Sequence, residues 1–444
     1  MRFIAFAVII AAIFGGCLFN NFILCFDSEV YIIKNPQMIG LSSIKDIWTT
    51  IIPTERMYLP VTYTVYNLIY NFSLWHSGLL DPFWFHLVNI AVHFANVCLV
   101  YLLLKKLVRD GFGAFLGALV FAVHPFQVEP VAWCMGLRDL LAGMFSLGSM
   151  LVFVRYLETA NRKLHYLCIA LFFLALLSKT SAIILPLAWY AIDRINFKKE
   201  AKPKIHYEAI IFGMALLLFF TVRLYGSREV DAFDLKDFLW SPIVALNAIG
   251  IYIKKIIFLG GFYINYEEPT LYKNLAGIFN ALLVIVFGVA VTLFSYKTRI
   301  FIFVVLFAVF MVPNLGNVII PVLNESIIQD RFIYMSMFAI SGITCYLAKR
   351  FNTITIFAVV IVFGLYSHVQ VKHWENELSV MHHALEYRPD AFNPNLVLSV
   401  CYGRVKNRER YKEHFEKALK KRPNDATIKK LYDIEFNQGG GIDE

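Results

Sequence analysis

The chain has little charge for its size. Aspartate, glutamate, lysine and arginine make up 16% of its 444 residues, while apolar residues make up 59%. Soluble globular domains carry about 25% charge, and the mean hydropathy here is +0.61. A soluble globular protein is therefore excluded, and the composition predicts a chain that crosses a membrane several times. Because backbone polar groups in lipid must be satisfied within the segment, we expect the spans to be helices.

Paired cysteines and clustered metal ligands are also missing. The seven cysteines include no CxxC spacing and mostly fall in apolar runs, which is typical of small buried side chains. His86 and His93 lie seven residues apart in one apolar run without a nearby third ligand, a pattern that favours helix packing. The sequence therefore suggests neither a disulfide framework nor a metal site.

Long apolar runs dominate what is present. A transmembrane helix needs about 17–25 mostly apolar residues. The first run exceeds the usual apolar core of a signal peptide, about 7–15 residues, so we expect it to be retained as a span. Eleven runs are candidate spans, several of them short: 3–25, 84–104, 112–124, 139–157, 164–178, 180–195, 206–225, 276–296, 299–313, 331–348 and 353–371. We predict an all-α polytopic membrane protein with about 11 transmembrane helices.

Basic residues set the expected orientation. Short loops such as 105–110 and 193–204 are rich in lysine and arginine, and such loops stay cytoplasmic. The N-terminus is then cytoplasmic, and eleven spans place the C-terminus outside. A further apolar run, 241–259, contains Lys254 and Lys255 and lies between basic loops. We expect it to lie at the outer surface or to be re-entrant, and whether it crosses the membrane stays open.

The first outer loop, roughly 26–83, contains two segments that predict interfacial helices. In residues 58–75, Val61, Val65, Leu68, Ile69 and Phe72 share one face at a spacing of three to four residues. Tyrosine and tryptophan side chains in the same segment are typical of the membrane interface. Such a helix would lie flat in the headgroup region, and residues 42–52 predict a second one. The alternative is an ordinary helix packed on the outer face.

The composition changes after Lys372. Residues 372–444 hold 13 basic and 12 acidic residues and few long apolar runs, which predicts a soluble tail. Residues 382–390 (HHALEYRPD) and 416–424 (EKALKKRPN) repeat one pattern at an offset of 34 residues, the period of tetratricopeptide repeats. We predict helices near 374–387, 393–405, 408–421 and 425–436. Since so short a solenoid is marginal by itself, we expect the tail to lean on the membrane domain, either as a docking surface or as a cap.

The predicted topology gathers ionisable residues at the outer ends of several spans. Such residues are costly at membrane depth and are functional candidates by default. They are Asp27 and Glu29 after the first span, His124, Glu129, Trp133, Arg138 and Asp139 after the third, Lys179 after the fifth, and Asp330, Arg331 and Tyr334 at the start of the tenth. Helix-end anchors and structural ion pairs are the alternative interpretation, and His124 fits a packing role equally well.

These residue types fit one chemistry. A carboxylate can accept the proton of a hydroxyl as its oxygen attacks a sugar carbon. Arginine and lysine can hold a phosphate leaving group, arginine by a bidentate fork. A site at the lipid surface suits a phosphate that stays attached to a long isoprenoid tail. The pattern favours glycosyl transfer from a polyprenyl-phosphate sugar.

Five segments and the tail carry a family resemblance. In chain order they read FDSEVYIIKNP, PFWFHLVNIAVHFANVCLVYLLL, HPFQVEPVAWCMGLRDLLAGMFSL, LLSKTSAIILPL and QDRFIYMSM. This order resembles the transmembrane and tetratricopeptide repeat-containing proteins, which are related to the dolichyl-phosphate-mannose protein O-mannosyltransferases of the GT-C fold. The resemblance implies a GT-C-like transmembrane glycosyltransferase domain over residues 1–371 and an extracytoplasmic tetratricopeptide-like helical domain over 372–444.

The resemblance also implies roles for the gathered residues. An acidic pair in the first outer loop supplies the catalytic base of an inverting transfer, here Asp27 or Glu29. We expect Arg331, Lys179 and Arg138 to hold the donor phosphate. Glu129, His124, Tyr334 and Asp330 are the expected substrate-binding residues. Since cationic side chains can hold a monophosphate, we expect a reaction that needs no metal ion.

The sequence departs from the family pattern at several positions. The motif QDRFIY carries Asp330 where the family has glutamate. YLPV at 58–61 lacks the family's arginine, and whether Arg56 replaces it stays open. Lys179 is followed by Thr180 in place of a carboxylate. These departures leave the sugar, the polyprenyl chain and the acceptor open.

Partners and location follow from the same resemblance. The expected partners are the polyprenyl-phosphate sugar, membrane lipids and a polypeptide or glycan acceptor that docks on the tail, with no nucleic acid. We expect a bacterial inner membrane with the tail in the periplasm, or the lumen of the endoplasmic reticulum in a eukaryote. A transporter or flippase of a lipid-linked substrate is one alternative, and a non-catalytic scaffold that anchors the tail is another.

Overall fold

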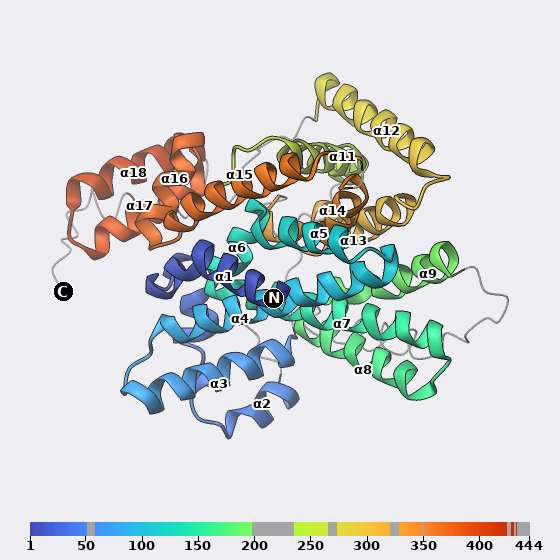
Figure 1. Cartoon of the computed structure of the whole chain (residues 1–444). Coiled ribbons are helices and arrows are strands. Elements are labelled where there is room, and N and C mark those ends of the chain that lie inside the picture. The colour runs from blue at the N-terminus through green and yellow to red at the C-terminus, as the bar shows by residue number, and fades with distance from the viewer. Residues whose placement is uncertain are drawn as a thin grey trace.

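The computed structural model describes residues 1–50, 58–197, 235–264, 273–319, 328–348, 350–423, 428, 429 and 432. Throughout these ranges the regular elements are helices (Figure 1), which confirms the all-α prediction. The predicted span at 206–225 and Arg56 lie outside the described residues, as does most of the predicted helix at 425–436.

The helices follow the apolar runs closely. The first half contains α1 (Arg2–Phe14), η1 (Gly15–Phe19), η2 (Leu24–Ile33), η3 (Pro36–Met38), α2 (Ser43–Thr49), α3 (Pro60–Ser77), α4 (Pro82–Val108), α5 (Gly111–Val123), η4 (Pro125–Gln127), α6 (Val128–Ala132), η5 (Cys134–Gly136), α7 (Leu137–Thr159), α8 (Arg162–Ser178), η6 (Thr180–Ile184) and α9 (Leu185–Asn196). The second half contains α11 (Leu235–Ile257), α12 (Leu275–Ser295), α13 (Phe301–Ile319), η8 (Asp330–Ile333), α14 (Ser336–Leu347), α15 (Thr353–Lys372), α16 (Glu377–Tyr387), α17 (Phe392–Arg404) and α18 (Arg408–Lys421).

Local sequence explains where the central helices begin. Asp81 caps α4 by accepting from the backbone N–H of Phe83 at 2.9 Å. Asp110 caps α5 by accepting from Phe112 and Gly113 at 3.0 and 3.1 Å. A side-chain acceptor at this position satisfies backbone donors that have no partner within the helix. These caps fix the two helices that line the centre of the molecule.

The described residues contain six helices long and apolar enough to cross a membrane. They are Arg2–Phe19, Pro82–Val108, Cys134–Thr159, Leu239–Ile257, Leu275–Ser295 and Thr353–Lys372. A seventh is possible if α5 and the following η4–α6 segment, which meet at 55°, form one broken span. The chain is thus a multi-pass membrane protein, but the predicted count of eleven spans is not confirmed, because several of the predicted runs fold into shorter helices.

The break after α5 has a local cause. His124 has an extended backbone (φ −65°, ψ 138°) directly before Pro125, and proline disfavours the helical conformation in the residue that precedes it. Proline also removes one backbone donor from the helix. The break turns the chain into η4, α6 and η5, which carry Glu129 and Trp133 into the candidate site.

Most of the run at 241–259, for which the sequence favoured a surface or re-entrant segment, lies in α11, which ends at Ile257. The helix packs against α12 and α13, and Leu239–Ile257 qualifies as a candidate span by length and composition. Lys254 is exposed, whereas the side chain of Lys255 is buried. Since the buried lysine has a carboxylate partner, described below, its presence does not exclude a helix inside the bundle.

The segment predicted as the first outer loop contains both expected helices, α2 and α3. Leu68, Phe72 and Trp75 of α3 are exposed, whereas Thr62 and Asn67 are buried. Thr62 donates to the carbonyl of Ser178 at 2.9 Å, which holds α3 against the end of α8. The exposed apolar side chains fit contact with lipid, and the interfacial placement stays a prediction.

The tail helices α16, α17 and α18 lie together at one end of the molecule (Figure 1). Their positions match the first three helices expected after Lys372. Val380, Met381, Ala384 and Leu398 belong to the main hydrophobic core, so the tail packs against the rest of the protein as expected. Its assignment to the tetratricopeptide class, and the domain boundary at 371, stay predictions.

Candidate active site

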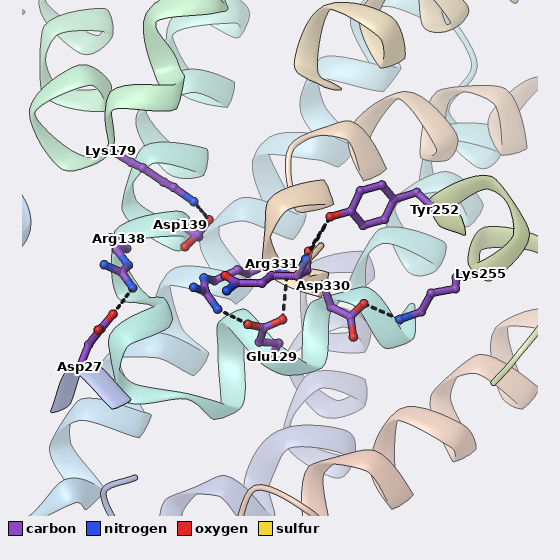
Figure 2. Close-up of polar contacts among 10 residues, drawn as sticks. Asp27, Glu129, Arg138, Asp139, Lys179, Tyr252, Lys255, Asp330 and Arg331 are labelled. Carbon is purple, nitrogen blue, oxygen red and sulfur yellow. Dashed lines mark hydrogen bonds and ion pairs between the residues drawn. The ribbon is translucent and has the colours of Figure 1, made fainter. Parts of the chain in front are cut away.

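The segment η2 sends its two carboxylates to different partners. It is a π-helical stretch, so residues two positions apart do not point to the same side as they would in an extended segment. Asp27 Oδ2 lies 2.7 Å from Arg138 Nη2 (Figure 2). Glu29 instead lies 2.5 Å from Lys34 Nζ and 3.2 Å from Arg404 Nη2 of α17. Asp27 therefore faces the bundle, while Glu29 faces the tail.

The environment of Glu29 keeps it ionised. The hydrogen bond from Lys34 holds the pKa of the Glu29 carboxyl below its usual range. Partial burial raises this pKa, but the charges of Lys34 and Arg404 lower it further. A carboxylate held by two cations is a weak base, so these contacts favour a structural role for Glu29.

The start of α7 provides a second pair of contacts. Arg138 and Asp139 are neighbours in sequence, yet Arg138 binds Asp27 and Asp139 binds Lys179 at the end of α8 (Figure 2). The guanidinium of Arg138 also lies 5.5 Å from the centre of the Trp133 ring. Arg138 and Asp139, two consecutive residues of α7, thus connect η2 to the end of α8.

Glu129 and Arg331 form the central ion pair. The Arg331 guanidinium binds Glu129, and the backbone N–H of Arg331 donates to Glu129 Oε2 at 3.0 Å. Both side chains are buried, with 11% of Arg331 and 4% of Glu129 exposed. Arg331 also lies 4.6 Å from the centre of the Trp133 ring. Trp133 therefore makes cation–π contacts with both Arg138 and Arg331.

Asp330 is paired with a residue that the sequence analysis did not place in the site. Its Oδ1 lies 2.7 Å from Lys255 Nζ, and both side chains are buried (Figure 2). Beside this pair, the hydroxyl of Tyr252 donates to the carbonyl of Gln329 at 2.9 Å. The signal for Lys255 in the sequence is a lysine inside an apolar run, which bears on topology as well as on function.

Tyr334 and His124 lie in packed surroundings. The Tyr334 hydroxyl accepts from Asn96 Nδ2 at 2.8 Å and lies 3.0 Å from His93 Nδ1. His124 is fully buried, accepts from the backbone N–H of Phe126 at 3.2 Å and stacks on the Phe126 ring. Asn96 and His93 of α4 therefore hold Tyr334 in place, and His124 stabilises the break after α5.

Two pockets lie beside these ion pairs. The first, pocket A, has about 470 Å³ of empty space, part of which is open to solvent. Its polar lining comes from Asp139, Ser146, Lys179, Ser181, Arg331 and Tyr334, and its apolar lining includes Leu185, Phe310 and Phe332. Pocket A therefore places two cations beside apolar walls.

The second pocket, pocket B, lies between the bundle and the tail and has about 320 Å³ of empty space, part of which is open to solvent. Its polar lining comes from Glu129, Asp330, Gln370, His373, Trp374 and His383. Among the predicted site residues, pocket A is lined by Lys179, Arg331 and Tyr334, and pocket B is lined by Glu129 and Asp330. Asp27, Glu29, Arg138 and His124 line neither pocket.

The described residues contain no group of three His, Cys, Asp or Glu side chains that could hold a metal ion. The carboxylates near the pockets are bound to lysine or arginine. The expectation that the reaction needs no metal ion stays a prediction.

Comparison with curated proteins finds relatives among protein O-mannosyl-transferases. The chain is 28% identical over 165 residues to protein O-mannosyl-transferase TMTC2 of Mus musculus, covering 34% of this chain and 19% of that protein. It is 30% identical over 155 residues to TMTC3 of Homo sapiens, covering 33% and 16%. It is 31% identical over 185 residues to F38B6.6 of Caenorhabditis elegans, covering 39% and 25%. The chain resembles the TMTC proteins.

These matches confirm the resemblance expected from the motifs, over a limited length. The matches span between about a sixth and a quarter of each of these relatives. No family model and no solved structure matches the chain.

Proposed function

We propose that the chain is a membrane glycosyltransferase that transfers a sugar, mannose in the first instance, from a polyprenyl phosphate to a hydroxyl group of a polypeptide. The relatives' names suggest the sugar and the acceptor. The single observation that carries the proposal is pocket A, where Lys179 and Arg331 lie beside apolar walls. A lipid-linked phosphate needs both kinds of surface at one place.

The donor phosphate would bind to the cations of pocket A. Arg331 presents a planar fork of donors and Lys179 a point charge. Both already have carboxylate partners, Glu129 and Asp139. We propose that these carboxylates hold the cations in position and that the phosphate binds to their remaining donors. Arg138, which is bound to Asp27, would orient the base more than it binds the phosphate.

Asp27 is the proposed base. Its side chain is 37% exposed, compared with 4% for Glu129, 5% for Asp139 and 7% for Asp330. An acceptor hydroxyl can therefore reach Asp27 more easily than the other carboxylates. Glu29 is also partly exposed, but it is bound to Lys34 and to the tail.

The proposed reaction is a single displacement at the anomeric carbon. Asp27 takes the proton of the acceptor hydroxyl, and the oxygen forms a bond to the anomeric carbon of the sugar. The bond between that carbon and the phosphate oxygen breaks, and the electron pair leaves with the polyprenyl phosphate. Lys179 and Arg331 stabilise the charge on the departing phosphate. Attack opposite the leaving group inverts the anomeric centre.

The test is sugar transfer by the purified protein in lipid nanodiscs, with a labelled polyprenyl-phosphate mannose and a peptide rich in serine and threonine. Removal of a general base costs about 10²–10⁴-fold in rate, so Asp27→Asn should lose at least about 100-fold. Asp46→Asn is the matched control, because Asp46 is an exposed residue of α2 in the same outer loop. Full activity of Asp27→Asn would refute the base, and movement of the intact donor across the membrane without transfer would favour a flippase.

A further inference from the structure

Asp139 uses only one of its two carboxylate oxygens in the contacts described above. The Lys179 ammonium at the end of α8 binds Oδ1 (Figure 2). Oδ2 is the one buried side-chain oxygen or nitrogen in the lining of pocket A for which the described residues offer no hydrogen-bond partner. A buried polar atom without a partner costs free energy, so such an atom in a folded protein needs an explanation.

The position of Asp139 makes this oxygen accessible from one direction. Asp139 lies in the first turn of α7, where a negative charge is favourable because the N-terminus of a helix carries a partial positive charge. The side chain is only 5% exposed, and it lines pocket A. A ligand group therefore reaches Oδ2 through pocket A.

The cations that we assign to the donor phosphate line the same pocket. The Phe332 ring lies against both of them, with its centre 5.3 Å from Lys179 Nζ and 5.3 Å from the Arg331 guanidinium. Lys179 is also the partner of Asp139. A phosphate bound to the remaining donors of Lys179 would therefore bring the group attached to that phosphate close to Asp139.

The lipid-linked donor has three parts, and one of them matches Oδ2. An ionised carboxylate accepts hydrogen bonds and donates none. The phosphate presents acceptor oxygens with the same sign of charge, and the isoprenoid tail has no hydrogen-bond donor. The sugar presents hydroxyl donors, and hydrogen bonds to a charged acceptor are among the stronger ones. The chemistry of Oδ2 therefore selects the sugar.

We propose that Asp139 Oδ2 accepts a hydrogen bond from one hydroxyl group of the donor sugar and thereby contributes to the choice of sugar; this rests on the proposed function. The enclosed part of pocket A is small, with room for about one water-sized group. Only the hydroxyl enters it, and the sugar ring lies at the part that is open to solvent. A sugar without a hydroxyl at that place leaves Oδ2 buried and unpaired, which disfavours its binding.

The first turn of α7 also relates the sugar to the proposed base. Arg138, which precedes Asp139, binds Asp27 at 2.7 Å. Consecutive residues of one helix thus contact the base and the sugar. Since the sugar is held at its phosphate and at one hydroxyl, its anomeric carbon has a fixed position relative to Asp27, which is the kind of orientation that accelerates an attack.

The first experiment measures equilibrium binding and needs no transfer. The full-length protein in nanodiscs is titrated with polyprenyl-phosphate mannose, with donors that each lack one mannose hydroxyl, and with polyprenyl phosphate alone. We expect one deoxy donor to bind at least about 10-fold more weakly than the complete donor, because a hydrogen bond to a charged group is lost. Equal affinity of the complete donor and every deoxy donor would overturn the proposal.

The second experiment assigns the contact to Asp139. Asp139→Asn keeps an oxygen for Lys179 and places an N–H donor where Oδ2 stands. We expect the variant to bind the complete donor and the critical deoxy donor equally, and to lose at least about 10-fold of the preference for mannose-linked over sugar-free polyprenyl phosphate. An equal deoxy effect in wild type and variant would assign the hydroxyl to another residue and overturn the proposal.

Asp193→Asn is the matched control for this substitution. Asp193 of α9 is 14% exposed, lies 3.7 Å from Arg194 and lines neither pocket. Its substitution should leave the preference for the mannose-linked lipid at the wild-type value. An equal loss of preference in both variants would show that the loss does not depend on Oδ2 of Asp139.

The outcomes separate the two proposals. A wild-type protein that transfers mannose but binds its donor no more tightly than polyprenyl phosphate alone would refute the sugar contact and keep the proposed function. A protein that shows the preference dependent on Asp139 but transfers no mannose to a peptide would refute the proposed function and keep the contact. A protein that binds neither lipid would refute both.

Discussion

Arg331 binds Glu129 through two separate groups, its guanidinium and its backbone N–H, the latter 3.0 Å from Glu129 Oε2. The two residues are 202 positions apart in the chain. The pair fixes η8 against α6, and with them the boundary between pockets A and B. Its loss would therefore disturb both pockets.

Glu129→Gln should destabilise the protein strongly. The substitution leaves the Arg331 guanidinium buried without its counter-charge, which costs about 3–5 kcal/mol for a buried pair. Glu158→Gln is the control, because Glu158 pairs with Lys106 at 2.5 Å with about a third of each side chain exposed, and such pairs contribute about 0–1 kcal/mol. Thermal unfolding in detergent measures the stability of both variants, and equal shifts in melting temperature would contradict the prediction.

Lys255→Met should also be destabilising, and Asp330→Leu should partly repair it. The single change leaves Asp330 buried without a partner, whereas the double change removes both charges from the interior. We expect a coupling energy of at least about 1 kcal/mol in the double-mutant cycle. Lys254→Met is the control, because Lys254 is exposed on the same helix. If the two substitutions changed the free energy of unfolding additively, Lys255 and Asp330 would not act as a pair.

Gly143→Ala should displace Tyr334. A Cβ atom at Gly143 would lie 2.8 Å from Tyr334 Cε1, and Tyr334 cannot move freely because its hydroxyl is bound to Asn96. Overpacking of this kind costs about 1–3 kcal/mol, and we expect the KM for the lipid donor to rise because Tyr334 lines pocket A.

Gly288→Ala is the control for this change. No atom lies within 4 Å of the corresponding Cβ on α12, and alanine is favoured over glycine inside a helix by about 1 kcal/mol. A Gly143→Ala protein as stable and active as the Gly288→Ala protein would mean that Tyr334 can be displaced without cost.

The contact between Glu29 and Arg404 should depend on pH. The pKa of Glu29 is held below its usual 4.5, chiefly by the hydrogen bond from Lys34. Since the folded-state pKa is lowered, the contact stabilises the protein above that usual value and is lost as the pH falls through the lowered one. At neutral pH, Arg404→Ala should therefore increase hydrogen exchange in residues 24–34.

The same difference should vanish in acid. Once Glu29 is protonated, wild type and Arg404→Ala should show equal protection in residues 24–34, after correction for the intrinsic exchange rate at each pH. Arg410→Ala is the control, because Arg410 pairs with Glu413 within α18 and this pair does not involve residues 24–34. A difference that persists below the lowered pKa would show that the effect of Arg404 does not depend on an ionised Glu29.

Much of the candidate site followed from the sequence because unusual residues stand out in apolar surroundings. Glu129, Arg138, Lys179 and Arg331 were identified in this way, and each lies near a pocket or an ion pair. Lys255 was missed, although it is as unusual as the others, because the surrounding run was assigned to the outer surface. The span count could not be obtained either, since a short apolar run alone does not distinguish a crossing helix from a packed one.

The sequence by itself determined the helical class, the apolar runs and the group of ionisable residues near the ends of the predicted spans. These properties are local, because a run of apolar residues must be buried and must satisfy its own backbone. The tertiary structure decided the partners. Asp27 binds a residue 111 positions away, and consecutive residues Arg138 and Asp139 bind different segments. It also decided that Asp27 and Glu29 diverge, since η2 is helical and not extended. Partner choice depends on which distant helices pack side by side, and no local pattern in the chain encodes that.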